Sequence, residues 1–207
     1  IKPKKLLLLD ANEFSLYSIL NELETQQNNY DLEIIPILAS IQDRKKITIL
    51  LNTWKPDTIY HAAAYKHVPI VEQNLAEGLK NNVFGTLVIA EASIKSKVSN
   101  LVFISTDKAV RPTSVMGASK RLGEMILQAL YDKKSSKAIT KFSMVRFGNV
   151  LDSSGSVIPK FRQQIKDRSP ITLTHPDVSR YFMTIKEAAE LVIQASAMSD
   201  GGEVFVL

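Results

Sequence analysis

The sequence has no cysteine, and this absence excludes disulfides, thiolate metal sites and a cysteine nucleophile. It has only three histidines, which lie far apart along the chain, so we expect no metal site. It has no apolar stretch near the roughly 18 residues of a membrane helix, and the apolar part of its opening segment, IKPKKLLLLD, is too short for a signal peptide. We therefore expect this chain neither to span a membrane nor to be addressed for export.

The composition is that of an ordinary globular chain. Its 207 residues are 45% hydrophobic and 23% charged, enough to bury the core of one domain or of one domain with a small appendage. A formal net charge of +5 and a pI near 9.3 would suit nucleic acid, an anionic membrane face or a phosphorylated small molecule. The basic residues are scattered, with no run of five, which favours the small molecule.

Short β-rich runs alternate with longer helical patterns along the first 150 residues, which is typical of parallel strands joined by crossover helices. The predicted strands are nearly continuous apolar runs, as expected of strands covered on both faces, at 5–10, 32–38, 57–63, 101–106 and 141–148. Apolar residues at spacings of three or four predict helices over 12–27, 44–54, 68–95 with a break near Gly78, and 115–131.

The regular alternation of predicted strands and helices ends at Gly148. DSSGS predicts a loop, residues 157–167 a helix opened by Pro159, ITLTHPDVSRYFM a strand and a turn, and residues 185–198 a last helix before GGEVFVL. A boundary near residue 150 therefore divides a nucleotide-binding sheet, residues 1–150, from a smaller appendage, residues 151–207.

Ligands of open α/β sheets bind outside the carboxyl ends of the strands, so the residues there are candidates for a site. Asp10 ends the first predicted strand, where a carboxylate either accepts both ribose hydroxyls of an adenosine, favouring NAD over NADP, or caps the helix starting near Asn12. Asp43 is an adenine contact or, as its position favours, the cap of the next helix. The small residues of HAAA, 61–64, would let a flat ring approach, although small residues also simply pack helices.

The fourth predicted strand runs into STDK, residues 105–108. A hydroxyl, a carboxylate and an ammonium in a row place an acid and a base side by side at the crevice, or else form a solvated turn with a local ion pair. Met116 and Lys120 lie four residues apart, so they share a helix face and point to the same crevice. Singly, Met116 is a core filler and Lys120 a solvated charge. Together with STDK, they favour a functional site.

These segments resemble the extended short-chain dehydrogenase/reductase family, and within it the bacterial UDP-N-acetylglucosamine 4,6-dehydratases of polysaccharide biosynthesis. The resemblance covers nearly the whole chain, through blocks in the family's order: HAAAYKHVP, NNVFGT, STDKAVRPTSVMGASKR, RFGNVLDSSGSVIP and SRYFMT. It implies a Rossmann-like α/β fold, a doubly wound parallel sheet with a small C-terminal UDP-sugar-binding region. The family usually has a tyrosine four residues before the lysine, and Met116 in that place is similar to its long, membrane-anchored subgroup.

One departure from the family is the absence of its first strand and of the glycine-rich loop that holds the cofactor pyrophosphate at a helix N-terminus. None of the eight glycines lies in such a loop. In a sheet of order 3-2-1-4-5-6 the missing strand would sit in the middle and leave two unpaired edges. We therefore expect a piece of a longer protein, inactive alone. Its parent would carry N-terminal transmembrane helices, with this region on the cytoplasmic side of the bacterial inner membrane.

The resemblance implies NAD as the cofactor and a UDP-sugar as the substrate, which loses water with no net redox change. Lys108 would be the base at C5, Asp107 the acid at C6 and Thr106 a hydrogen-bonding positioner. Met116 can only pack, so the C4 hydroxyl proton must go to Asp107 or to water. Lys120 would hold the nicotinamide ribose through its three donors. Further cofactor contacts are implied for Asp10, Asp43, Ala62, Ala63, Ala64, Asn82 and Ser105.

The resemblance also places substrate contacts. Asn149 and Arg180 match positions near the diphosphate, which an arginine fork suits, although Arg180 could form a mere surface ion pair. Lys66 and His67 would border the sugar, and a structural role for His67 stays equally open. We expect a homo-oligomer and no nucleic-acid partner. Two rivals remain open: a related nucleotide-sugar 4-epimerase, and a non-catalytic dinucleotide-sensing module, for which loss of the tyrosine would be natural.

Overall fold

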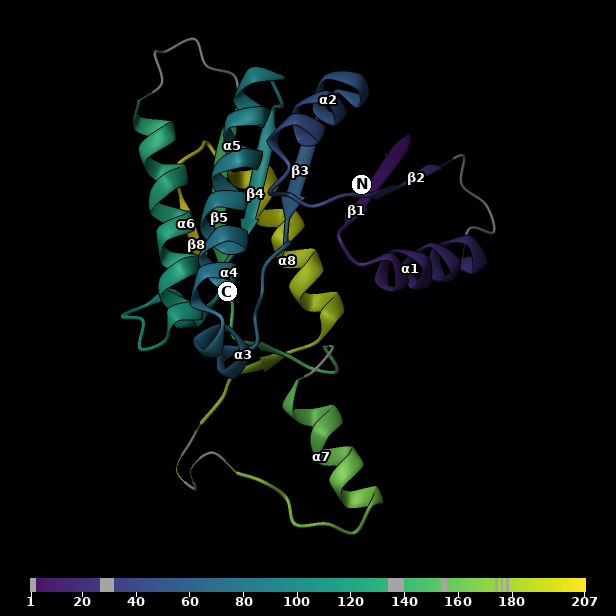
Figure 1. Cartoon of the computed structure of the whole chain (residues 1–207), viewed down its shortest axis with the longest axis vertical. Helices are drawn as coiled ribbons and strands as arrows, with labels where there is room; N and C mark the ends of the chain where they lie inside the picture. Colours follow the sequence, from purple (N-terminus) through teal and green to yellow (C-terminus); the bar gives the residue numbers. More distant parts are fainter. Residues whose placement is uncertain are drawn as a thin grey trace.

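The computed structural model describes residues 3–26, 32–133, 140–153, 156–173, 175, 177 and 179–207. Within them the chain has an α/β fold in which helices cover both faces of parallel strands (Figure 1). The strands are β1 Lys5–Asp10, β2 Glu33–Leu38, β3 Thr58–His61, β4 Asn100–Ile104, β5 Lys141–Arg146, β6 Asn149–Val150, β7 Phe182–Met183 and β8 Val204–Val206.

The α-helices are α1 Glu13–Gln26, α2 Arg44–Trp54, α3 Val68–Gln73, α4 Leu75–Leu79, α5 Thr86–Lys95, α6 Val115–Asp132, α7 Val157–Lys166 and α8 Ile185–Met198. A π-helix, η1 Lys80–Gly85, joins α4 to α5, and a short 3-10 helix, η2 Asp107–Ala109, follows β4. The fold class predicted from the sequence, a Rossmann-like arrangement of parallel strands and crossover helices, is confirmed.

The parallel strands fall into two separate sheets in the described part of the chain. The larger has the order β3-β4-β5-β8, and the smaller pairs β1 with β2. Figure 1 shows β1 and β2, with α1, set to one side of the larger sheet. The unpaired edges therefore lie where the 3-2-1-4-5-6 order predicts a further strand.

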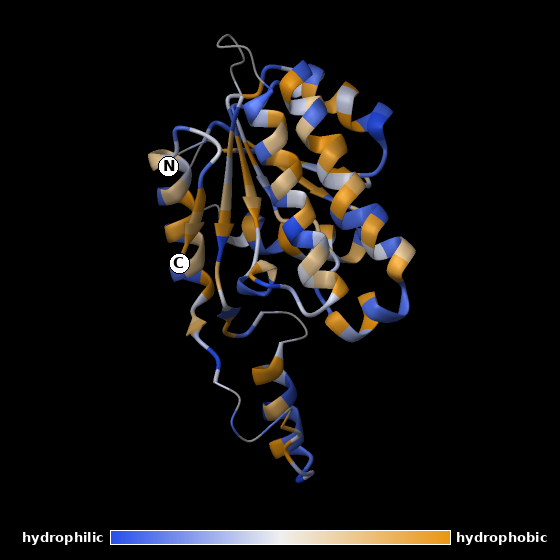
Figure 2. Cartoon of the chain, turned by 90° about the vertical axis from the view of Figure 1, so that its left-hand side faces the viewer, coloured by the Kyte–Doolittle hydropathy of each residue, from blue (hydrophilic) through white to orange (hydrophobic). Residues whose placement is uncertain are grey.

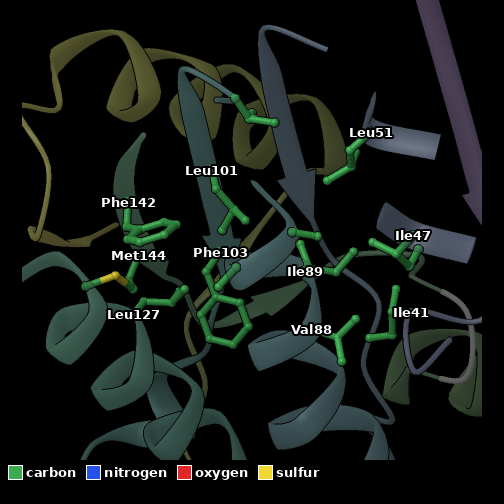
Figure 3. Packing of buried hydrophobic residues seen from close by; sticks show 13 residues of the cluster. Ile41, Ile47, Leu51, Val88, Ile89, Leu101, Phe103, Leu127, Phe142 and Met144 are labelled. Atoms are coloured by element: carbon green, nitrogen blue, oxygen red, sulfur yellow. The ribbon is translucent and has the colours of Figure 1, made fainter. Parts of the chain in front are cut away.

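Alternation of side chains along β4 and β5 builds a core on each face of the larger sheet. On one face, Leu101 and Phe103 of β4 pack with Phe142 and Met144 of β5 against α5 and α6 (Figure 3). On the other, Val102 and Val145 pack against Val192 and Ala195 of α8. Figure 2 shows these strands largely in the colours of hydrophobic residues. Burial on both faces explains why the strand sequences lack polar alternation.

Three predicted strands end two residues earlier than expected, at His61, Ile104 and Arg146. After Ile104 the chain stays beside β5 through two backbone hydrogen bonds. Ser105 N donates to Val145 O (2.7 Å), and Asp107 N donates to Phe147 O (3.1 Å). The backbone then turns into η2. The residues just past the strands are thus freed from the ladder to line a cavity.

The helical break predicted near Gly78 lies instead at Asn74, between α3 and α4. Gly78 is inside α4, where it permits close packing, since an added Cβ would lie 2.8 Å from Val71 Cγ1. The glycine therefore marks a helix contact rather than a helix end. The π-helix that follows buries both Asn81 and Asn82, and such bulges are frequent at functional sites.

Residues 151–207, set apart in the sequence as an appendage, divide into two parts. The helix predicted over 157–167 is α7, which buries no side chain and projects away from the sheets (Figure 1). Of the strand and turn predicted over 171–183, the structure has only β7, paired with β6, while Thr174, Pro176 and Val178 lie outside the described residues. The last helix, α8, and β8 return to the larger sheet.

Candidate active site

A cavity of about 780 Å³ opens at the carboxyl ends of β3, β4 and β5. Its walls come from the segments that follow these three strands and from helices α6, α7 and α8. The structure brings together here most of the residues singled out from the sequence: Ala62, Ala64, Lys66, His67, Ser105, Thr106, Lys108, Met116, Lys120 and Asn149. These residues therefore gather at the carboxyl ends of the strands, where ligands of open α/β sheets bind.

Thr106, Asp107 and Lys108 form a compact hydrogen-bonded group, of which Thr106 and Lys108 line the cavity and Asp107 does not. Lys108 Nζ lies 2.9 Å from Asp107 Oδ1, and the Thr106 hydroxyl donates to the same oxygen over 2.8 Å. Lys108 Nζ also lies 3.4 Å from Asn149 Oδ1, which follows β5. The group is half-exposed, so solvent or a ligand can reach it.

The charge state of Asp107 follows from these bonds. Partial burial raises the pKa of its carboxyl, but the hydrogen bonds from Lys108 and Thr106 outweigh burial, and the pKa lies below its usual value. Asp107 is therefore ionised near neutral pH. A carboxylate in this state accepts a proton before it can donate one.

Lys120 is a buried ammonium with an unusual neighbourhood. Its Nζ lies 4.0 Å above the ring of Phe103, a cation–π contact, and makes no hydrogen bond to the residues that the structure describes. Burial lowers the pKa of Lys120 to about 7, against the opposing effect of the Glu124 carboxylate. Its three donors face a cavity that can take a ligand.

His61 contacts the same phenylalanine, with ring centroids 5.4 Å apart. Its Nε2 lies 2.9 Å from Thr86 Oγ1, which itself donates to Asn82 O over 2.7 Å. Because that hydroxyl has only one proton, His61 Nε2 must be the donor to Thr86. Burial, and next the Lys120 charge, lower the pKa of His61 to about 3, so its imidazole is neutral.

Met116 lies in the first turn of α6, buried and lining the cavity. Ser114 begins the helix, accepting a hydrogen bond from Gly117 N (3.1 Å). An added Cβ at Gly117 would overlap the carbonyl oxygen of Lys108, so only glycine lets this turn approach the segment after β4 so closely. This close approach brings Met116 and Lys120 to the same cavity as Lys108.

Asn82 acts within the protein rather than on the cavity wall. Its side-chain oxygen accepts from Tyr65 N (2.8 Å), and its amide nitrogen donates to Tyr65 O (3.0 Å) and to Ser119 Oγ (3.0 Å). Ser119 in turn donates to Met116 O. The asparagine therefore holds the loop after β3 against α6, because its side-chain amide bonds both segments.

Other predicted site residues lie away from the cavity lining. Asp43 accepts from Lys46 N (2.9 Å) and caps α2, as its position favoured. Asp10, at the end of β1, accepts from Asn12 N over 2.7 Å. Arg180 is exposed and donates to Ser179 O (3.0 Å). Ala63 follows β3 but does not line the cavity.

Sequence reasoning missed the residue with the densest polar contacts beside the site, Glu124 of α6. This carboxylate is fully buried and accepts from Ser105, Arg121 and Arg146. The available signal was its spacing, one helical turn after Lys120.

The described residues hold neither a metal-binding cluster nor a membrane-spanning helix. No group of three or more metal-ligating side chains of His, Cys, Asp or Glu occurs there. In the same part of the chain, no helix is both long and apolar enough to cross a membrane.

Fold and site together define a Rossmann-like α/β protein with an Asp–Lys ion pair and a buried lysine at the carboxyl ends of its central strands. The chain belongs to the polysaccharide biosynthesis protein family, whose model matches residues 1–207. It is 50% identical over 205 residues to the capsular polysaccharide biosynthesis protein CapD of Staphylococcus aureus, covering 99% of this chain and 34% of that protein. The chain thus spans about a third of the length of that relative.

Other relatives carry the names of two different activities. A UDP-glucose 4-epimerase of Rickettsia canadensis is 41% identical over 150 residues, covering 72% of this chain and 44% of the epimerase. A UDP-N-acetylglucosamine 4,6-dehydratase (inverting) of Campylobacter jejuni is 27% identical over 206 residues, covering 99% of this chain and 59% of the dehydratase. The solved structure of Pen from Bacillus thuringiensis has a TM-score of 0.89 and 34% identity, covering 99% of this chain and 63% of Pen.

Proposed function

We propose that the full-length protein is an NAD-dependent dehydratase that converts UDP-N-acetylglucosamine to a UDP-4-keto-6-deoxy-N-acetylhexosamine. The observation that carries this proposal is the Asp107–Lys108 pair beside the cavity, with Thr106 bonded to the same carboxylate oxygen. Elimination of a C6 hydroxyl needs an acid and a base close together, and this pair supplies both. The similarity to a named dehydratase supports the same reaction.

The residues of the cavity fit NAD. The Lys120 ammonium is buried there without a described hydrogen bond, so its donors are available to the hydroxyls of the nicotinamide ribose. Ala62 and Ala64 leave room for a flat ring beside it. When bound, NAD supplies the temporary oxidation of the sugar at C4 and the reduction at C6. Asp10 would contact the adenosine ribose only in the full-length protein, where the two sheets are completed.

Asp107 is in the right state to begin the proton transfers. As an ionised carboxylate it accepts the proton of the C4 hydroxyl, a task that the thioether of Met116 cannot perform. Once neutral, Asp107 no longer stabilises the Lys108 ammonium by charge, which favours loss of the Lys108 proton. Lys108 then takes the C5 proton, Asp107 donates its proton to the C6 hydroxyl, and water leaves. Lys108 then returns the C5 proton and regains from solvent the proton that it first released there, which completes the balance.

The UDP part of the substrate would lie toward Asn149 and the segment around Arg180. Asn149 already contacts Lys108, so a ligand bound there is held next to the acid–base pair. Arg180 is exposed and able to turn its fork toward a diphosphate. Lys66 and His67 also line the cavity and would border the sugar.

A nucleotide-sugar 4-epimerase is the main alternative, and the epimerase relative favours it by its higher identity. An epimerase must rotate a ketone and return hydrogen to C4, and it removes no C6 hydroxyl. A base beside an acid would then have no substrate proton at C5 to take. A non-catalytic dinucleotide-sensing module is a third candidate, for which the acid–base pair would have no role.

Mass spectrometry of UDP-N-acetylglucosamine incubated with the full-length protein and NAD separates the three candidates. We expect a product lighter by one water. An unchanged mass with a new isomer would identify an epimerase instead, and an unaltered substrate would indicate the sensing module. Asp107→Asn in the same assay should remove the product without abolishing NAD binding.

A further inference from the structure

Glu124 is a fully buried carboxylate that accepts four hydrogen bonds. Its Oε1 accepts from Ser105 Oγ (2.7 Å) and Arg146 Nε (2.8 Å), while Oε2 accepts from Arg146 Nη2 (2.6 Å) and Arg121 Nη1 (2.9 Å). The Arg146 pair is bidentate, the geometry that fixes orientation most strongly. Burial raises the pKa of Glu124, but these bonds outweigh burial and the pKa lies below its usual value. Glu124 is therefore charged.

Each partner of Glu124 adjoins a different part of the candidate active site. Ser105 immediately precedes Thr106 at the end of β4, and Arg146 is the last residue of β5, three residues before Asn149. Glu124 itself lies one turn after Lys120 on α6. One carboxylate thus joins the ends of two strands to the helix that carries the buried lysine.

The charge of Glu124 also acts on Lys120. The Lys120 ammonium has no described hydrogen bond, and Glu124 is the anion that opposes the effect of its burial. Neutral His61 on β3 is affected by the Lys120 charge, and Arg146 of β5 and Arg121 of α6 bond the same Glu124 carboxylate. Lys66, His67 and Lys108, the last paired with Asp107, line the same cavity as Lys120. Without Glu124, Lys120 would lose the anion that opposes the effect of its burial, and Arg146 would lose its bidentate partner.

We propose that Glu124 is a positioning residue with two tasks: it holds the Asp107–Lys108 segment in place relative to Lys120, and its negative charge keeps Lys120 as an ammonium ion that can bind the cofactor ribose. This inference rests on the proposed function, in which Lys120 binds NAD and Asp107 and Lys108 act on the sugar. A merely structural Glu124 would anchor Arg146 without influencing the proton affinity of Lys120.

The test compares Glu124→Gln and Glu124→Asp with the wild type in the full-length protein. Calorimetry measures NAD affinity from pH 5.5 to 9. We expect wild-type affinity to fall as pH rises through the pKa of Lys120, because only the ammonium donates all three bonds. Glu124→Gln keeps the shape but removes the charge, so the fall should begin about one pH unit lower. The loss of affinity should be about fivefold at pH 7 and approach about tenfold at higher pH. Glu77→Gln, which removes an exposed carboxylate paired with Lys80, is the control. It should not change the pH at which NAD affinity has fallen by half.

Glu124→Asp separates position from charge. It keeps the anion but is one methylene shorter, so it cannot reach both Ser105 and Arg146. We expect the wild-type pH midpoint for NAD binding, with dehydration slowed at least tenfold. Equal weakening of NAD binding by Glu124→Gln at every pH would overturn the charge effect, and an Asp variant with wild-type turnover would overturn the positioning. If Glu124→Gln does not fold, the Asp variant and the wild-type pH profile still decide.

The outcome is distinguishable from failure of the proposed function. Suppose the wild type binds NAD with the expected pH dependence and Glu124→Gln shifts it, but the sugar nucleotide keeps its mass. The dehydratase proposal would then be wrong, and the effect of Glu124 on Lys120 would stand. If instead water is lost but the midpoint is the same in both proteins, the inference about Glu124 fails alone.

Discussion

Asp107 and Lys108 are neighbours in sequence, yet their charged ends meet, with Lys108 Nζ 2.9 Å from Asp107 Oδ1. In a regular strand, successive side chains point to opposite faces and could not meet. The 3-10 turn η2 begins at Asp107. Thr106 caps this turn, because its hydroxyl accepts a hydrogen bond from Lys108 N. This turn lets two adjacent residues form an ion pair, whose lysine lines the cavity.

Asp107→Asn should lower the turnover of the full-length enzyme about 100- to 10,000-fold, the usual contribution of general acid–base catalysis. The amide keeps the shape of the side chain but can neither accept the C4 hydroxyl proton nor donate to the C6 oxygen. Steady-state kinetics with UDP-N-acetylglucosamine measures the effect. A variant within threefold of the wild type would show that water carries both protons.

Lys108→Met should abolish exchange of the C5 hydrogen with solvent deuterium. The methionine approximates the length of the lysine but has no basic nitrogen, so the C5 proton has no acceptor. Oxidation at C4 precedes this step, so absorbance at 340 nm should still report reduced cofactor after substrate is added. Deuterium incorporation at the wild-type rate would assign the C5 base to another residue.

How far the sequence predicts this site depends on how local each feature is. The STDK segment and the face shared by Met116 and Lys120 follow from strand ends and helical spacing, and the structure places Lys108, Met116 and Lys120 around one cavity. These features need only a few consecutive residues. The division of the parallel strands into two sheets also agrees with the 3-2-1-4-5-6 order, because none of the glycines lies in the loop that would follow the central strand of that order.

The features that the sequence did not predict depend on distant partners. Glu124 is buried because Arg146, 22 residues away, reaches it from β5. Gly78 looked like a helix end, but it is required by contact with Val71 on the preceding helix. The pairing of β6 with β7 joins segments 33 residues apart, as Asn149 is opposite Phe182. Local propensity holds no information on such contacts.

His61 should make the protein less stable in acid. Its pKa is lowered from 6.5 to about 3 by burial and next by Lys120, so below pH 6.5 the unfolded chain binds a proton that the folded chain does not. The free energy of unfolding should therefore fall with falling pH between these values, by up to about 1.4 kcal/mol per pH unit. Urea unfolding at pH 7, 6, 5 and 4 measures this slope.

Two variants isolate the contribution of His61 to that slope. His61→Gln keeps a donor for Thr86 but does not titrate. The change of its free energy of unfolding with pH should therefore be smaller by up to about 1.4 kcal/mol per pH unit, the contribution of one proton. Thr86→Val removes the hydrogen-bond partner and leaves the imidazole in place, so stability should drop at every pH while the acid dependence persists. Identical slopes in wild type and His61→Gln would contradict the prediction.

Met116→Leu should be nearly harmless in the full-length enzyme, because leucine has about the volume of methionine and such swaps usually cost less than about 1.5 kcal/mol. Met116 is buried at the cavity, and a thioether has no proton to transfer. Met125→Leu, at an exposed position of the same helix, controls for the effect of leucine on α6 itself. Turnover and thermal unfolding are measured for both variants beside Asp107→Asn. The ranking of the three variants by turnover shows whether Met116 only packs. Suppose Met116→Leu slows turnover as much as Asp107→Asn but unfolds at the wild-type temperature. The sulfur would then have a chemical role, and Asp107 would not take the C4 proton alone.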